Sequence, residues 1–230
     1  MVARIETGLT QLNTLIKAPS MGGPAGQAPA IVKKSIGEVA PQIVDPAHYP
    51  ALAALLTQYG VINRLRRKLM TLSGRNGKVV LAKNTIGAAD NKGFVYLGVD
   101  FLKEFQDQVE VLAGVMAHEW GHLSSNLLKY GNLDDLSWDE IFDIRRDEEA
   151  SADAFAGRNL PLMGYSVEPL ICFLSQGKDK LGSHKYYNTQ IRAHILREAA
   201  KTTQERQGFA QKLFGSSIYP NPYTSVLLIA

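Results

Sequence analysis

The chain has 230 residues, enough to bury one sizeable core, so one domain with appendages is expected rather than two full domains. Apolar residues make up 45% of the chain and charged residues 20%, a balance that excludes a disordered or fibrous protein. The net charge of +3 arises from 25 Lys and Arg against 22 Asp and Glu, a surplus too small for a dedicated nucleic-acid-binding protein.

The N-terminal region carries no targeting or membrane signal. No charged segment followed by an apolar core opens the chain, and no stretch reaches the about 18 uninterrupted apolar residues of a membrane span. We therefore expect a cytoplasmic protein without an integral membrane segment. Residues 18–30 are small residues and helix breakers, which predicts a flexible arm within an N-terminal segment 1–45.

A helix is expected after Asp45-Pro46, which is a favourable helix start. Apolar residues recur there at helical spacing, at Leu52, Leu55, Leu56, Tyr59, Ile62, Leu65 and Leu69. Residues 78–83 and 93–98 lie on either side of a turn signal at Asp90-Asn91 and are rich in β-branched and aromatic residues. These two runs predict short strands of a small sheet.

Four more helices are predicted, over residues 107–128, 138–157, 167–174 and 188–207. Gly157 and Pro161 mark the expected end of the second. The single cysteine, Cys172, lies in an apolar run, which predicts a buried thiol and excludes an intrachain disulfide. The chain is thus expected to be α+β and mostly helical, with one domain over 46–210 and an extended tail over 211–230.

The motif that carries chemistry is His118-Glu119-Trp-Gly-His122. Two histidines four residues apart lie on the same side of a helix, close enough to bind one tetrahedral ion. Neutral imidazoles suit Zn²⁺, and Glu119 then lies beside a zinc-bound water as its proton acceptor. The competing explanation is a chance meeting of polar residues in a buried helix, which the preceding apolar run disfavours because unpaired polar groups there are costly to bury.

The third metal ligand is expected further along the chain. A metzincin-type continuation needs Gly and His where Ser125 and Leu128 stand, so that class is excluded. Glu149 and Asp153 are four residues apart on the second predicted helix, with small residues between them that allow close helix packing. Glu149 is the expected ligand, and Asp153 the expected hydrogen-bond acceptor for a ligand histidine.

Two alternatives to this assignment stay open. Glu148, next in sequence to Glu149, is the second choice for the ligand. The second alternative is that the whole acidic stretch, which also includes Asp143 and Asp147, forms a solvated helix face.

The chain resembles the HtpX and CAAX-prenyl-endopeptidase group of gluzincin peptidases in the motifs His118–His122 and Glu149–Asp153. Softer matches follow at residues 163–170 and 182–192, so the resemblance spans about residues 50 to 200. It implies a zincin-like (minimal gluzincin) fold, one zinc ion per chain and hydrolysis of a peptide or protein substrate. The membrane helices of many family members are missing, and Lys185 stands where the family commonly has proline.

The resemblance also implies a group that stabilises the oxyanion of the reaction. The candidates are His184, where the family's segment begins, together with Tyr186, Tyr187 and Arg192. The alternative for each of the four is ordinary packing or a surface position.

Peptidases of this kind hold their substrate extended along an exposed strand. Phe94, Val95, Tyr96 and Leu97 are expected to supply that strand, and the alternative is that they form an internal strand.

We therefore expect an active zinc endopeptidase. The alternative is a catalytically silent, zinc-stabilised binding or scaffold protein, which would have no need of Glu119 beside an open metal position. The arm at 18–30 or the apolar tail, which ends in Val226-Leu-Leu-Ile-Ala230, is a candidate for holding the enzyme latent. Oligomeric state and cleavage preference have no signal in the sequence.

Overall fold

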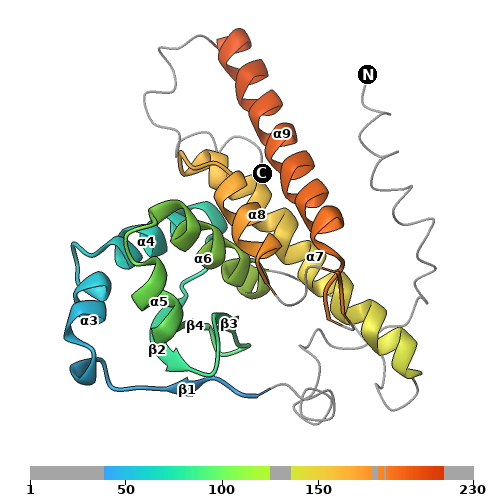
Figure 1. Ribbon diagram of the computed structural model, residues 1–230. Coiled ribbons are helices and arrows are strands. Elements are labelled where there is room, and N and C mark those ends of the chain that lie inside the picture. Colours follow the sequence, from blue (N-terminus) through green and yellow to red (C-terminus); the bar gives the residue numbers. More distant parts are fainter. Residues whose placement is uncertain (1–38, 125–135, 178–180, 184, 215–230) are drawn as a thin grey trace.

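The computed structural model describes residues 39–124, 136–177, 181–183 and 185–214. Within these ranges the chain is mostly helical with one small mixed sheet, so the predicted α+β class is confirmed (Figure 1). The arm at 18–30, residues 215–230 of the predicted tail and His184 lie outside the described residues. No helix of the described chain is both long and apolar enough to cross a bilayer.

The region before the sheet contains two helices, α3 (Pro50–Leu56) and α4 (Val61–Ser73), after a short 3₁₀ turn η1 (Pro46–His48). The prediction of one continuous helix is therefore wrong. A tight turn at Thr57 separates the two helices, and the Gly60 N–H donates to the Thr57 carbonyl at 3.0 Å. A Cβ on Gly60 would lie 2.1 Å from the Leu55 carbonyl oxygen, so the chain passes too close for any other residue.

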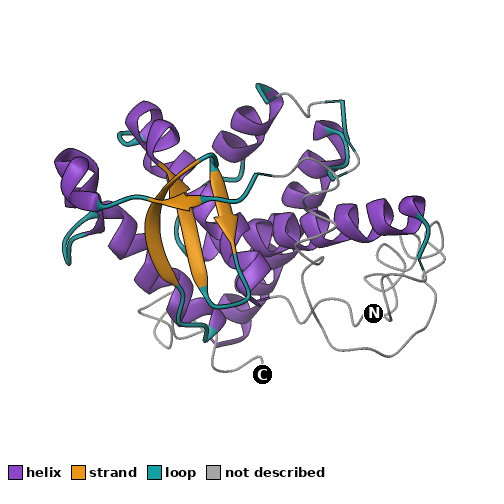
Figure 2. Cartoon of the chain, turned by 90° about the horizontal axis from the view of Figure 1, so that it is seen from below, coloured by secondary structure: helices purple, strands orange, loops and turns teal. Residues whose placement is uncertain are grey.

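The sheet has four strands, β1 (Gln42–Ile43), β2 (Lys78–Lys83), β3 (Gly87–Ala89) and β4 (Phe94–Gly98). Their order is β1-β2-β4-β3, with β2 and β4 parallel and the two outer strands antiparallel to their neighbours. Figure 2 shows the strands as one curved sheet beside the helices. The expected strands at 78–83 and 93–98 are present.

The prediction that Phe94, Val95, Tyr96 and Leu97 form an exposed strand is wrong. These residues belong to β4, which pairs with β2 on one side and with β3 on the other. Its main-chain groups are therefore used within the sheet, and none is left for a docked peptide. The edge strand on this side is β3, a three-residue strand that the sequence pattern did not indicate.

Helix α6 (Val109–Ser124) follows the short helix α5 (Val99–Phe105) and is buried almost all round, from Val111 to Gly121. Such a helix lies inside the core rather than on its surface. Trp120, fully buried, anchors it to α4 through a hydrogen bond of 2.9 Å from its indole Nε1 to Ser73 Oγ. The histidine motif is thus carried by the most enclosed helix in the described part of the chain.

Helix α7 (Trp138–Leu162) starts with a capping box between Ser137 and Glu140. It continues through Gly157 and Pro161, so the predicted end is wrong. Gly157 instead permits close packing, because a Cβ there would lie 2.5 Å from the Leu196 carbonyl oxygen on α9. The helix ends at Leu162, and Gly164, which follows the C-cap Met163, has a φ of +84° that suits glycine.

The last helices are α8 (Glu168–Ser175) and α9 (Thr189–Phe214). Helix α9 packs along α7 (Figure 1) and extends beyond the predicted end at 207 and the domain boundary at 210. Cys172 is exposed, so the prediction of a buried thiol is wrong. On α8 the buried side carries Leu170 and Ile171, and Cys172 is turned away from it.

Candidate metal centre

The site forms where α6 and α7 touch. At this junction, a Cβ built on Gly121 would lie only 2.7 Å from Ala152 Cα, closer than any side chain allows. The two helices therefore approach each other through a glycine and an alanine. This approach brings the face of α6 that carries His118 and His122 against the face of α7 that carries Glu149.

Three side chains converge between these helices. His118 Nε2 lies 3.1 Å from Glu149 Oε2, and His122 Nε2 lies 3.6 Å from the same oxygen. Their three candidate ligand atoms lie within 4.8 Å of one another. His118 and Glu149 are buried and His122 is half-buried. The group can hold a metal ion, and its two nitrogens and one carboxylate oxygen form a donor set that suits a divalent transition metal.

The surroundings of His118 test whether a cation fits. Its Nδ1 lies 2.9 Å from Asp153 Oδ1, while its Nε2 faces Glu149, so both ring nitrogens meet carboxylate oxygens. A neutral imidazole has only one N–H, so one of the two contacts needs an added positive charge. Burial lowers the pKa of His118, but hydrogen bonds to Asp153 and Glu149 outweigh burial and raise it to about 10. A metal ion at Nε2 supplies this charge without a second proton.

Asp153 joins the centre to α9. This carboxylate is completely buried, and it accepts hydrogen bonds from Arg192 Nε at 2.7 Å and Arg192 Nη2 at 2.9 Å. Burial alone would raise the pKa of Asp153, but Arg192 and His118 lower it. Asp153 therefore stays ionised and fixes the orientation of the His118 ring.

Glu149, and not Glu148, faces the histidines. Glu148 is also buried, but its Oε2 lies 3.3 Å from Arg145 Nη1, one helix turn back. Burial alone would raise the pKa of Glu149, but Lys185 and the two histidines hold it well below its usual range. Glu149 is thus ionised, as a metal ligand must be.

The predicted oxyanion groups have different surroundings. Arg192 is used in the ion pair with Asp153, and the Tyr187 hydroxyl donates to Asp147 Oδ1 at 3.0 Å, so both are already engaged by carboxylates other than Glu149. Tyr186 lies near Glu149, because Lys185 Nζ is 5.1 Å from the Tyr186 ring centroid and 3.3 Å from Glu149 Oε1. Burial, and then the charge of Glu149, raises the pKa of the Tyr186 hydroxyl. Tyr186 is the remaining candidate among the described residues.

Glu119 lies beneath the edge strand β3. A Cβ on Gly87 would lie 2.7 Å from Glu119 Oε1, so the β3 backbone runs directly over this carboxylate. Glu119 is buried, yet it forms no hydrogen bond or ion pair within the described part of the chain. A buried carboxylate without such partners is costly, which is typical of a group that meets a ligand or water.

Sequence reasoning missed two parts of the site, Lys185 and the strand at Gly87. Lys185 Nζ lies 3.3 Å from Glu149 Oε1, across a separation of 36 positions that no local pattern links. The small residues Gly87-Ala-Ala89 were the only available hint of a close approach to α6, because glycine in a strand often marks one.

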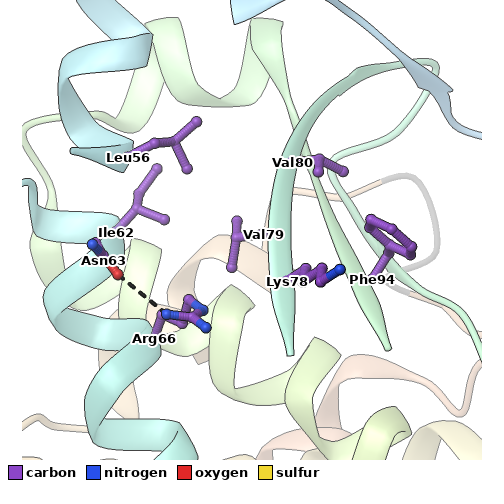
Figure 3. A pocket seen from close by; sticks show the side chains of 8 residues that line it. All are labelled: Leu56, Ile62, Asn63, Arg66, Lys78, Val79, Val80 and Phe94. Carbon is purple, nitrogen blue, oxygen red and sulfur yellow. Dashed lines mark hydrogen bonds between the residues drawn. The ribbon is translucent and has the colours of Figure 1, made fainter. Parts of the chain in front are cut away.

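A separate pocket lies between α4 and β2, at the side of the sheet away from β3 (Figure 3). Its lining includes Arg66, Lys78 and Phe94, and none of the residues of the metal centre. Arg66 is held in place by the Gly77 carbonyl and Asn76.

Comparisons of this chain with family models, with curated proteins and with solved structures found no match. The class of site is therefore defined by its own geometry, a buried group of two histidines and one glutamate able to hold a metal ion.

Proposed function

We propose that this chain is a zinc-dependent endopeptidase with a zincin-like, gluzincin-type arrangement. The observation that carries the proposal is the convergence of His118, His122 and Glu149, together with the buried carboxylate of Glu119, which follows His118 on α6. The resemblance of the two motifs to gluzincin peptidases supports the same conclusion. When bound, zinc supplies Lewis acidity, which polarises the scissile carbonyl and acidifies the attacking water.

Glu119 is the proposed general base. It follows His118 directly on α6, its carboxylate is buried beneath β3 at Gly87, and it has no competing partner among the described residues. Its carboxylate accepts a proton from the attacking water and then delivers that proton to the leaving nitrogen. Because β3 covers the Glu119 carboxylate on α6, bulk water does not compete for the transferred proton.

The proposed platform for an extended peptide is the outer edge of β3. This edge strand pairs only with β4 among the described strands, and it crosses over Glu119 at Gly87. A peptide that pairs with β3 through main-chain hydrogen bonds runs past the Glu119 carboxylate. Tyr186, whose ring lies 4.8 Å from the Arg192 guanidinium carbon, is the proposed hydrogen-bond donor to the oxyanion.

The test combines metal analysis with cleavage of a mixed peptide library. The wild-type chain is expected to bind one zinc ion and to cleave peptides, while Glu119→Gln keeps the zinc and loses cleavage. Glu104→Gln, at an exposed position of α5, is the matched control and should behave as the wild type. If the wild type binds zinc but cleaves no better than Glu119→Gln, the chain is a zinc-stabilised scaffold and not a peptidase.

A further inference from the structure

The two oxygens of Glu149 have different partners. Oε2 faces both imidazoles, at 3.1 Å from His118 Nε2 and 3.6 Å from His122 Nε2. Oε1 points the other way and lies 3.3 Å from Lys185 Nζ. Because Glu149 is buried, this division is set by its neighbours and not by solvent.

The local chain holds Lys185 beside Glu149. Ser183 Oγ accepts from the main-chain N–H groups of both Lys185 and Tyr186 at 3.2 Å, and the Ser183 N–H donates to the Tyr186 carbonyl at 2.8 Å. The Lys185 ammonium also lies over the Tyr186 ring, 5.1 Å from its centroid. A lysine side chain is flexible by itself, so these contacts reduce the entropy lost when it pairs with Glu149.

Because the two Glu149 oxygens have different partners, the number of coordination positions that stay open on a bound ion is affected. Carboxylates bind metals through one oxygen or through both. If both Glu149 oxygens bind, the ion has five ligands once a water is bound, and the position that a catalytic site keeps free for a substrate oxygen is lost. A lysine ammonium on Oε1 competes with the ion for that oxygen.

We propose that Lys185 is a positioning residue that restricts Glu149 to one metal–oxygen bond and so keeps one coordination position open. This inference rests on the proposed function for the identity of the site as a catalytic zinc centre. It concerns a lysine at a position where the peptidases that the sequence resembles commonly have proline.

The experiment uses the full chain, loaded with Co²⁺ in place of zinc, and measures the visible absorption of the bound cobalt. Four-coordinate cobalt absorbs strongly, and a fifth ligand weakens the bands. The wild type and Lys185→Arg should both show the strong bands. Lys185→Met and Lys185→Gln should still bind one ion per chain, with band intensity reduced about twofold because the freed oxygen adds a bond.

The control is Lys201→Met, at an exposed position of α9, and its spectrum should match the wild type. Circular dichroism checks that each variant is folded, and the glutamine variant provides a second test if the methionine variant is unstable. Unchanged spectra in Lys185→Met and Lys185→Gln, or loss of metal from them, would overturn the proposal.

The two proposals can fail separately. If the spectra change as expected but the wild-type chain cleaves no peptide, Lys185 has the proposed role and the peptidase function is rejected. If peptides are cleaved but the cobalt bands of the Lys185 variants stay at the wild-type intensity, the peptidase function stands and the role of Lys185 is rejected.

Discussion

Adding one methyl group at Gly121 should separate the two halves of the metal centre. A Cβ at this position would lie 2.7 Å from Ala152 Cα and 3.0 Å from the Ala152 carbonyl oxygen, whereas ordinary van der Waals separation begins at 3.4 Å. The closer of these two distances falls short by about 0.7 Å, so α6 and α7 must move apart by a similar amount. Metal sites tolerate ligand displacements of only about 0.2 Å, so the Gly121→Ala variant should bind zinc at least about tenfold more weakly.

The stability of this variant should change less than its zinc affinity. Overpacking costs about 1–3 kcal/mol, and the better helix propensity of alanine over glycine offsets about 1 kcal/mol of that. Thermal unfolding of the metal-free protein should therefore show a small loss, while competition with a chelating dye measures the large loss of zinc affinity. Gly208→Ala, in an open position of α9, is the control and should leave zinc binding unchanged. Wild-type zinc affinity in Gly121→Ala would refute the claim that the close approach of α6 and α7 sets the distance between the ligands.

Three further predictions concern single groups of the centre. Glu149→Ala should lose zinc while Glu148→Ala keeps it, as metal analysis of the purified variants will show, and equal zinc contents would reject this choice of ligand. Gly87→Ala should keep one zinc but cleave peptides at least about tenfold more slowly, because the methyl group displaces Glu119; an unchanged rate would argue against β3 as the strand above the base. Arg192→Leu should lower the free energy of unfolding of the metal-free protein by about 3–5 kcal/mol in urea titrations, because it leaves a buried carboxylate without its partner. A loss below about 1 kcal/mol would mean that water reaches this carboxylate.

The sequence predicted well those parts of the molecule that depend on helical periodicity. His118 and His122, like Glu149 and Asp153, are separated by four residues, and that spacing alone places each pair on one side of a helix. The small residues between Glu149 and Asp153 also indicated close packing, which the meeting of Gly121 and Ala152 realises. Helix existence followed from the same patterns.

The features that the sequence did not predict depend on contacts between distant segments. Gly157 has the appearance of a helix end, but its role is to let α9 approach α7, and only the presence of α9 reveals this. The status of β4 as an internal strand depends on β3, whose three small residues have little strand propensity of their own. A strand as short as β3 forms because it completes the pairing of β4, so its own residues could not predict it.

The sequence alone could not decide between Glu148 and Glu149 as the ligand, and the orientation of α7 decides it. Both are acidic, adjacent and buried, so composition does not separate them. Consecutive residues of a helix point about 100° apart, so only one of them can face α6. Glu149 shares its face with Asp153, which contacts His118, whereas Glu148 turns toward Arg145 on its own helix. The candidate ligand is thus selected by helical phase relative to Asp153, and the buried partner Arg145 explains how a second carboxylate is tolerated so close to the candidate metal centre.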